Sequence, residues 1–166
     1  MTDTARRTRG ARTRPELSVR RATSADLDVI IPLRAAQRRE DPSSLREPTL
    51  DDDGAELIAL TRRQLGDTGQ LWLLAERDAP CGLLRCAIIR RDDTAPYAVL
   101  TTAYVVPQAR RDGVLRQLVE HATTWAAAQG VTEVRLRTNA PNAAAAAAWG
   151  ALGFTPAIVT WRRSGA

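Results

Sequence analysis

The sequence contains no lysine, a single histidine, two cysteines and one phenylalanine among 166 residues, and it has no long hydrophobic run. A membrane-spanning helix needs about 20 apolar residues, so we expect no membrane partner. One histidine cannot supply the Cys and His ligands of a zinc site at their usual spacing, so we expect no metal cofactor. Cys81 and Cys86 fall on one predicted strand at an odd separation, which places them on opposite faces and too far apart for a disulfide. These absences fit a protein of the reducing cytoplasm.

Hydrophobic residues make up 44% of the chain and charged residues 26%. This balance is typical of a soluble globular protein and differs from that of a disordered chain. A length of 166 residues suffices for one domain with a substantial core and is short for two. Every basic residue is an arginine and alanine is abundant, which we attribute to a GC-rich bacterial genome rather than to function.

The first fifteen residues carry five arginines against one aspartate, so they hold +4 of the formal net charge of +5. No apolar stretch follows them to complete a secretory signal. We expect residues 1–15 to be a flexible basic N-terminal tail and residues 16–166 to form a single domain. The tail could steer an acidic partner or nucleic acid, but nucleic-acid binding rests on the tail alone and is not favoured.

The first part of the domain predicts a short strand followed by two helices. The strand covers residues 17–22, and Ser24 is a good N-cap for an amphipathic helix. Pro32 lies inside that helix and is expected to bend or shorten it. Residues 41–48 are rich in proline, serine and charge and predict a loop, and a second helix is expected from about Thr49.

The rest of the chain predicts three strands in succession and then alternating helices and strands. A turn at residues 78–81 joins the first two strands into an antiparallel hairpin. The order indicates a mixed α/β fold with antiparallel strands first and a βαβ crossover later. The strands are expected at 70–77, 82–90, 97–106, 133–138 and 157–162, and the helices at 112–129 and 142–152.

Residues 104–115 run from a predicted strand through a short turn into the start of a helix. The first N–H groups of a helix have no intrahelical partner, and with the positive end of the helix dipole they bind anions. Gly113 allows a close approach to a phosphate, and Arg110 and Arg111 add positive charge. The pattern is neither G-x-G-x-x-G nor a Walker A sequence. It predicts a turn that binds a pyrophosphate.

Two segments resemble motifs of the GNAT superfamily of N-acetyltransferases, in the order and at the spacing of that family. The first resembles the acetyl-CoA signature and reads Val105-x-Pro107-x-x-Arg110-x-x-Gly113-x-Leu115-x-x-Leu118. The second resembles the later motif and reads Asn142-x-x-Ala145-x-x-x-Trp149-x-x-x-Gly153-Phe154.

The resemblance implies a GNAT-like domain whose central mixed sheet has splayed fourth and fifth strands that admit the thioester arm of acyl-CoA. The backbone of Ala103 and Val105 would pair with that arm, and Asn142 would face the pantetheine. The N–H of Val105 would donate to the thioester oxygen. The pyrophosphate would bind the turn at Arg110, Arg111, Asp112, Gly113, Val114 and Leu115.

The sequence departs from the family pattern at two positions. Leu115 stands where a small residue is usual, which directs a side chain toward the pyrophosphate site. Trp149 stands at the acid position, where a tyrosine commonly protonates the departing thiolate. An indole is no useful acid, but a thiolate whose conjugate acid has a pKa of about 8.5 can leave with help from water or N–H groups.

A general base is missing from the expected place. The predicted strand over residues 98–106 holds no carboxylate, and its polar candidates are Thr101, Thr102 and Tyr104. Carboxylates on the neighbouring hairpin could act through water, and these are Glu76, Asp92 and Asp93. The catalytic positions that the resemblance leaves are therefore Val105, Tyr104 and Trp149.

The sequence as a whole predicts an N-acyltransferase that moves an acetyl or short acyl group from acyl-CoA to a primary amine by direct attack on the thioester. The acceptor is expected to be a small-molecule amine or a peptide N-terminus, and the protein a monomer or homodimer. One alternative is transfer from an acyl carrier protein. Another is a non-catalytic module that binds or senses acyl-CoA, an alternative that the missing acid and base leave open.

Overall fold

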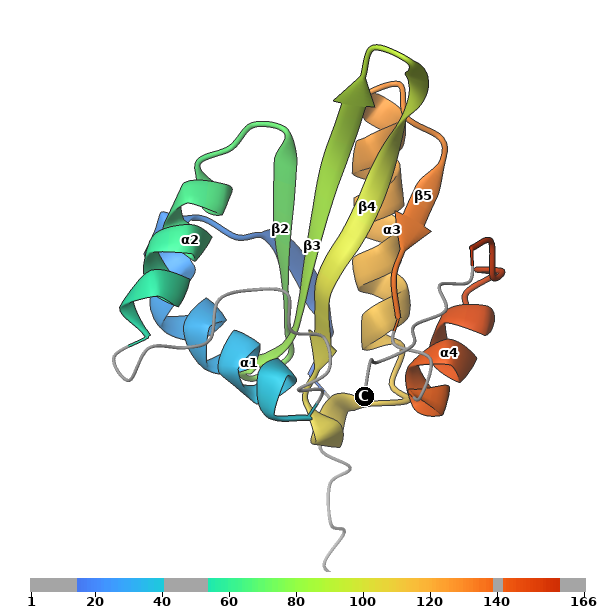
Figure 1. Cartoon of the computed structure of the whole chain (residues 1–166). Coiled ribbons are helices and arrows are strands. Elements are labelled where there is room, and N and C mark those ends of the chain that lie inside the picture. Colours follow the sequence, from blue (N-terminus) through green and yellow to red (C-terminus); the bar gives the residue numbers. More distant parts are fainter. Residues whose placement is uncertain (1–14, 41–53, 139–141, 159–166) are drawn as a thin grey trace, which may run out of the picture.

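The computed structural model describes residues 15–40, 54–138 and 142–158, which form helices around one sheet (Figure 1). The strands are β1 (Ser18–Arg21), β2 (Gln70–Glu76), β3 (Pro80–Arg91), β4 (Thr94–Val105) and β5 (Val134–Leu136). The helices are α1 (Leu27–Glu40), α2 (Ala55–Leu65), α3 (Val114–Ala128) and α4 (Ala143–Gly150), with short 3-10 turns η1 (Ser24–Asp26) and η3 (Pro107–Ala109). The predicted last strand is absent at residues 157–158, and its remainder lies outside the described residues, as do the predicted loop at 41–48 and residues 1–14 of the predicted tail.

The strands of the described residues form one five-stranded sheet in the order β1-β2-β3-β4-β5. The first four strands pair antiparallel in succession, whereas β4 and β5 pair parallel. A parallel pair needs a crossover connection, and α3 supplies it. The predicted mixed α/β class, with antiparallel strands first and a βαβ crossover later, is therefore confirmed.

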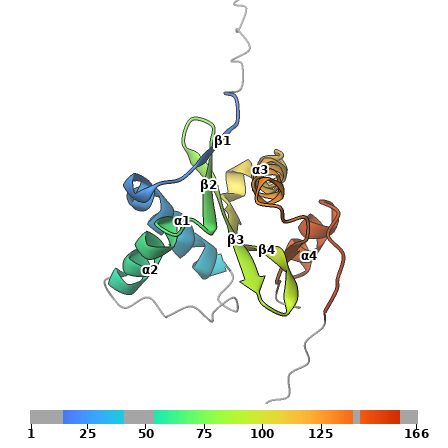
Figure 2. The same cartoon turned by 90° about the horizontal axis from the view of Figure 1, so that it is seen from above.

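Helices cover both faces of the sheet. Figure 2 shows α1 and α2 on one face and α3 on the other. Successive residues of a strand point to opposite faces, so Leu83 joins the cluster under α1 while Leu84 joins the larger cluster under α3. Among the described residues, no helix has the length and apolarity that crossing a bilayer demands.

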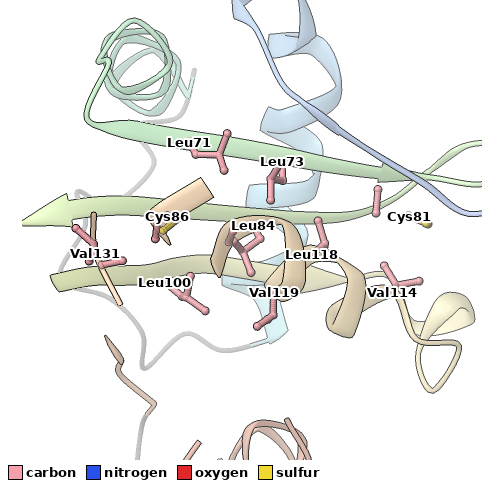
Figure 3. Packing of buried hydrophobic residues seen from close by; sticks show 14 of the residues in the cluster. Leu71, Leu73, Cys81, Leu84, Cys86, Leu100, Val114, Leu118, Val119 and Val131 are labelled. Carbon is pink, nitrogen blue, oxygen red and sulfur yellow. The ribbon is translucent and has the colours of Figure 1, made fainter. Parts of the chain in front are cut away.

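The larger cluster places α3 close against β3 (Figure 3). Gly82 of β3 makes this approach possible, because a Cβ atom at that position would lie 2.8 Å from Cγ1 of Val114 and 3.1 Å from Cδ1 of Leu118. Val114 and Leu118 are fully buried in the first and second turns of α3. The missing side chain at Gly82 therefore sets the position of the N-terminal turn of α3.

Both cysteines pack in the cluster under α3 and are free thiols. The expectation that they lie on opposite faces of the sheet was wrong. The pairing of β2 with β3 shifts between Ala75, which faces Gly82, and Glu76, which faces Pro80. The extra residue, Cys81, forms a bulge that turns its side chain toward the side of Cys86. Burial raises the pKa of the Cys86 thiol to about 11, so this thiol is unreactive at neutral pH.

The N-terminal helices differ from the sequence prediction in three details. Thr23, rather than Ser24, is the cap, and it forms a capping box with Asp26. The helix α1 continues through Pro32 for its full 14 residues, since burial of neighbouring apolar side chains outweighs one lost hydrogen bond. The helix α2 begins at Ala55 after Gly54 in the left-handed conformation, later than the predicted start near residue 49.

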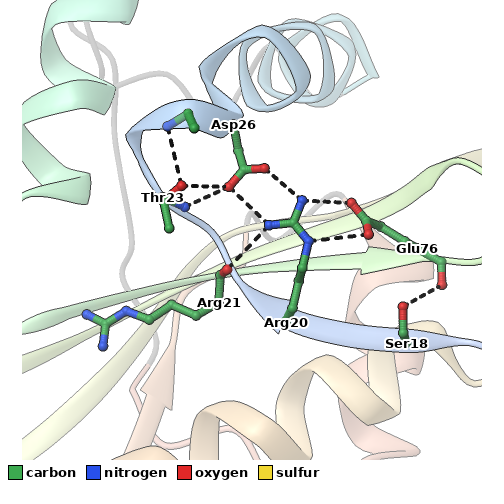
Figure 4. Close-up of polar contacts among 7 residues, drawn as sticks. Ser18, Arg20, Arg21, Thr23, Asp26 and Glu76 are labelled. Atoms are coloured by element: carbon green, nitrogen blue, oxygen red, sulfur yellow. Dashed lines mark hydrogen bonds and ion pairs between the residues drawn. The ribbon is translucent and has the colours of Figure 1, made fainter.

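An ion-pair cluster ties β1 to the start of the α1 segment and to the end of β2 (Figure 4). The guanidinium of Arg20 lies 2.7 Å from a carboxylate oxygen of Asp26 and 2.9 Å from one of Glu76. The hydrogen bond from Arg20 holds the pKa of Asp26 at about 2, well below its ordinary value. The carboxylate of Glu76 is thus engaged on the β1 side of the sheet.

Substitution of Gly82 tests the contact between β3 and α3. We expect Gly82→Ala to lower the free energy of unfolding by about 1–3 kcal/mol, because the new methyl group overpacks the cluster. Urea denaturation followed by circular dichroism measures the change. Gly150→Ala is the matched control, since no described atom lies within 4 Å of a Cβ at that helical position. Equal stability of the two variants would contradict the packing described.

Candidate active site

The strands β4 and β5 pair over only part of their length. Residues 98–100 of β4 pair with β5, whereas β4 continues to Val105. Figure 1 shows the two strands diverging beyond this paired stretch, toward the C-terminal end of β4. The separation matches the predicted splay of the fourth and fifth strands, and within the described residues no strand pairs with residues 101–105 on the β5 side.

A bulge in β4 changes which face its last residues occupy. Arg85 faces Thr101 and Leu83 faces Tyr104, so two residues of β4 lie opposite one residue of β3. Thr102, inside this bulge, has a φ of 51°. The alternation shifts as a result: Ala103 and Val105 pack toward the cluster under α3, and Tyr104 packs toward α1.

The backbone of Val105 is directed away from β3. The N–H of Val106 donates to the carbonyl of Cys81 at 3.0 Å, and in an antiparallel ladder the residues next to such a bonded position face the other way. The N–H and C=O of Val105 therefore point toward the gap between β4 and β5. The carbonyl accepts a hydrogen bond of 3.0 Å from Nε of Arg110.

The turn between β4 and α3 leaves the helix N-terminus uncapped. The N-cap residue of α3 is Gly113, whose φ is 80° and which has no side chain to bond the N–H groups of the first turn. The first α3 bond runs from the N–H of Gln117 to the carbonyl of Gly113, so the preceding N–H groups of the first turn have no intrahelical acceptor. Arg111 also has a positive φ, 66°, a strained conformation of the kind found at binding sites. Free donors, the helix dipole and open space around Gly113 suit an anion.

The side chains of this turn have separate tasks. Asp112 pairs with Arg77 at 3.2 Å, which neutralises a carboxylate that would repel an anion. Val114 is fully buried, and Leu115 is partly buried and packs against the cluster under α3. Arg111 is exposed. The turn lies where the sequence predicts it, and Leu115 is partly buried, while the binding of a pyrophosphate there stays a prediction.

The side chain of Arg110 makes contacts that the sequence does not predict. Its guanidinium turns back over the ring of Tyr104, with 5.9 Å between the guanidinium carbon and the ring centroid, and pairs with the carboxylate of Glu40 at the end of α1. The hydroxyl of Tyr104 donates to the other oxygen of Glu40 at 2.8 Å. We call Glu40, Tyr104 and Arg110 the Glu40 cluster. Sequence reasoning missed Glu40, because nothing in the local pattern distinguishes it from a solvated residue at a helix end.

The Glu40 cluster keeps its carboxyl group ionised. Partial burial opposes ionisation of Glu40, but hydrogen bonds from Arg110 and Tyr104 outweigh it and lower the pKa of the carboxyl. Burial and the bond to Glu40 raise the pKa of Tyr104. At neutral pH the cluster therefore consists of a carboxylate, a guanidinium and a neutral phenol.

The carboxylates considered as bases from the sequence lie elsewhere. Asp92 and Asp93 form the turn between β3 and β4, at the opposite end of the twelve-residue strand from Val105. At about 3.3 Å per residue, the strand separates them from Val105 by roughly 35 Å. Glu76 is held by Arg20. The described residues contain no group of three or more His, Cys, Asp or Glu side chains that could hold a metal ion.

The family model described as the Acetyltransferase (GNAT) family matches residues 33–154. The chain belongs to the GNAT family of acetyltransferases. This membership confirms the predicted family and enzyme class, an acyl-CoA-dependent N-acetyltransferase, and favours it over a non-catalytic module.

Two curated relatives carry the name Aminoglycoside N(6')-acetyltransferase type 1. The one from Klebsiella aerogenes is 47% identical over 58 residues, which cover 35% of this chain and 38% of the relative. The one from Acinetobacter genomosp. 13 is 32% identical over 110 residues, which cover 63% of this chain and 75% of the relative. The first match thus spans well under half of that relative, and the second spans three quarters.

A solved structure shows the same fold over nearly its whole length. The ligand-free aminoglycoside antibiotic 6'-N-acetyltransferase from Acinetobacter haemolyticus aligns with a TM-score of 0.71 and 24% identity, covering 90% of this chain and 98% of that one. The likeness supports the GNAT fold of the chain.

The later GNAT motif forms a structural unit in this chain. The side-chain oxygen of Asn142 accepts a hydrogen bond of 3.0 Å from the N–H of Ala145 and caps α4. The contact of Asn142 with pantetheine stays a prediction. The N–H of Phe154 donates to the carbonyl of Trp149, and the N–H of Gly153 donates to the carbonyl of Gly150. With Gly153 at a φ of 87°, these two hydrogen bonds form a Schellman cap at the end of α4. The rings of Trp149 and Phe154 meet edge to face, with centroids 5.5 Å apart. These contacts give Trp149 a packing role.

Substitution of Gly113 tests the anion site. We expect Gly113→Glu to weaken acetyl-CoA binding by about 10-fold or more, because it adds a side chain and a negative charge beside the free N–H groups. Gly130→Glu is the matched control: Gly130 follows the other end of α3, has a φ of 75° and is equally open. Calorimetric titration measures both affinities. Normal binding by Gly113→Glu would contradict the site.

Proposed function

We propose that this GNAT enzyme transfers the acetyl group of acetyl-CoA to an amino group of an aminoglycoside. Binding of acetyl-CoA as the donor is supported by the edge of β4 that β5 leaves unpaired. There the backbone of Val105 faces the gap between β4 and β5, close to the N-terminus of α3. The acceptor half is supported by the names of the two curated relatives, one of them 32% identical over 75% of its length.

The reaction needs few side chains. The amine nitrogen forms a bond to the thioester carbonyl carbon, the carbon–sulfur bond breaks, and the sulfur leaves with the electron pair. The N–H of Val105 is suited to stabilise the charge that develops on the carbonyl oxygen. The excess proton of the amine passes to solvent, and a thiolate near pKa 8.5 is a good leaving group. Holding two reactants together supplies much of the rate.

The positions proposed as catalytic therefore have unequal tasks. Val105 acts through its backbone, Tyr104 belongs to the Glu40 cluster, and Trp149 packs against Phe154. Acid catalysis by Trp149 is not part of the proposal. Ala103, Asn142 and the turn residues at 110–115 form the proposed donor site.

An acyl carrier protein remains the alternative donor. The exposed Arg111 and Arg116 lie beside the turn and would suit its acidic surface. Docking through charges weakens steeply with ionic strength, which distinguishes a carrier protein from free acetyl-CoA. We further infer a bacterial, cytoplasmic enzyme, since the relatives are bacterial and both buried thiols are free. The tail, the domain bounds and the oligomeric state stay predictions.

The proposed acceptor is tested by acetylation of an aminoglycoside that carries a 6'-amine. We expect release of free CoA thiol and a mass increase of one acetyl group on the antibiotic. An aminoglycoside with a hydroxyl in place of the 6'-amine is the matched control and should react at least 10-fold more slowly. Transfer to peptide N-termini, with none to either antibiotic, would contradict the proposed acceptor while leaving the enzyme class unchanged.

A further inference from the structure

Glu40 occupies a place that is electrostatically unfavourable for a carboxylate. It is the last residue of α1, where the negative end of the helix dipole repels an anion. Its two carboxylate oxygens are nevertheless both engaged, one by the hydroxyl of Tyr104 and the other by the guanidinium of Arg110. A carboxylate at the C-terminal end of a helix is disfavoured by the helix dipole, and such departures from local preference are typical of functional sites.

The Glu40 cluster contacts β4 on both sides of the Val105 N–H. Tyr104, whose carbonyl belongs to the same peptide unit as that N–H, is anchored through its side chain. Arg110 donates to the carbonyl of Val105, which belongs to the next peptide unit. One helical turn before Glu40, Gln37 donates to the carbonyl of Ala103 at 3.4 Å. The last turn of α1 therefore contacts Ala103 and Tyr104 directly and reaches Val105 through Arg110.

This end of β4 pairs with β3 on one edge and, among the described residues, with no strand on the other. The bulge at Thr102 interrupts the pairing of β4 with β3, which resumes at Tyr104 and Val105, and the described part of β5 pairs with β4 only at residues 98–100. A strand that is paired on one edge is held less firmly than a strand paired on both, so the contacts from α1 and Arg110 add to the fixation of this stretch. An oxyanion donor misplaced by about 1 Å loses much of its effect.

We propose that Glu40 is a positioning residue for the reaction, which holds the Val105 N–H toward the thioester oxygen through Tyr104 and Arg110. The inference rests on the proposed function of that N–H. It assigns no contact between Glu40 and either substrate. Glu40 and Arg110 have side chains that are 42% and 46% exposed, whereas Tyr104 is 8% exposed, so the cluster joins a buried strand to the surface.

The test compares steady-state kinetics of Glu40→Gln with the parent enzyme, using acetyl-CoA and the 6'-amino aminoglycoside. Glutamine keeps the shape of the side chain but removes the charge that holds Arg110 and Tyr104. We expect kcat to fall about 10-fold, with the KM of the acceptor and the calorimetric Kd of acetyl-CoA changing less than threefold. Glu120→Gln, an exposed glutamate on α3, is the control and should leave all three unchanged.

A second variant keeps the test decisive if Glu40→Gln folds poorly. Tyr104→Phe removes a single hydroxyl, and we expect it to lower kcat about threefold. Because the two residues act as a unit, the double variant should lose little more than Glu40→Gln alone.

Two outcomes would overturn the proposal for Glu40. A raised acceptor KM with unchanged kcat would make Glu40 an acceptor-binding group, and unchanged kinetics would make the cluster purely structural. In both cases the parent enzyme acetylates the antibiotic, so the proposed function stands. A parent enzyme that transfers acetyl groups to other amines only would overturn the proposed acceptor, and Glu40→Gln would then be measured with those amines.

Discussion

The close contact between Gly82 and the first turns of α3 determines where the candidate active site lies. With no side chain at Gly82, Val114 and Leu118 pack directly on β3. This contact places the N-terminus of α3 next to the strand end that contains Val105, since Gly82 and Val105 are paired neighbours in the sheet. The free N–H groups of α3 and the open edge of β4 therefore lie at the same end of the sheet. A hydrophobic packing constraint thus brings together two polar features, each weak as a site by itself.

The second constraint is the asymmetry of the two sheet faces at that end. On the α3 face, the packed first turn and the ion pair of Arg77 with Asp112 fix the turn that suits an anion. On the α1 face, the Glu40 cluster fixes the same stretch of β4 from the opposite side. The bulge at Thr102 allows both, because it sends Tyr104 to one face and the backbone of Val105 to the edge. The helix α3 therefore fixes the turn proposed to bind the donor, and the helix α1 fixes the backbone of the last residues of β4.

The sequence predicts the order of elements well because hydrophobic periodicity and turn residues act locally. It also indicates the turn at Gly113, since a glycine between a strand and a helix is typical of a turn whose backbone adopts a positive φ. The pairings that depend on tertiary structure are not visible in it. Glu40 meets Arg110 across 70 positions of the chain, and neither residue carries a local signal of the other. Trp149 occupies an acid position by motif alignment, whereas its neighbours in space make it part of a helix cap.

The most direct measurement is an amide chemical-shift titration of the isotope-labelled protein with acetyl-CoA. If the N–H of Val105 and the first turn of α3 bind the donor, the resonances of Val105, Gly113 and Val114 will shift or broaden. That of Gly130, at the far end of α3, will stay in place. Shifts confined to the turn between β3 and β4 around Asp92, with Val105 and Gly113 unmoved, would contradict the site.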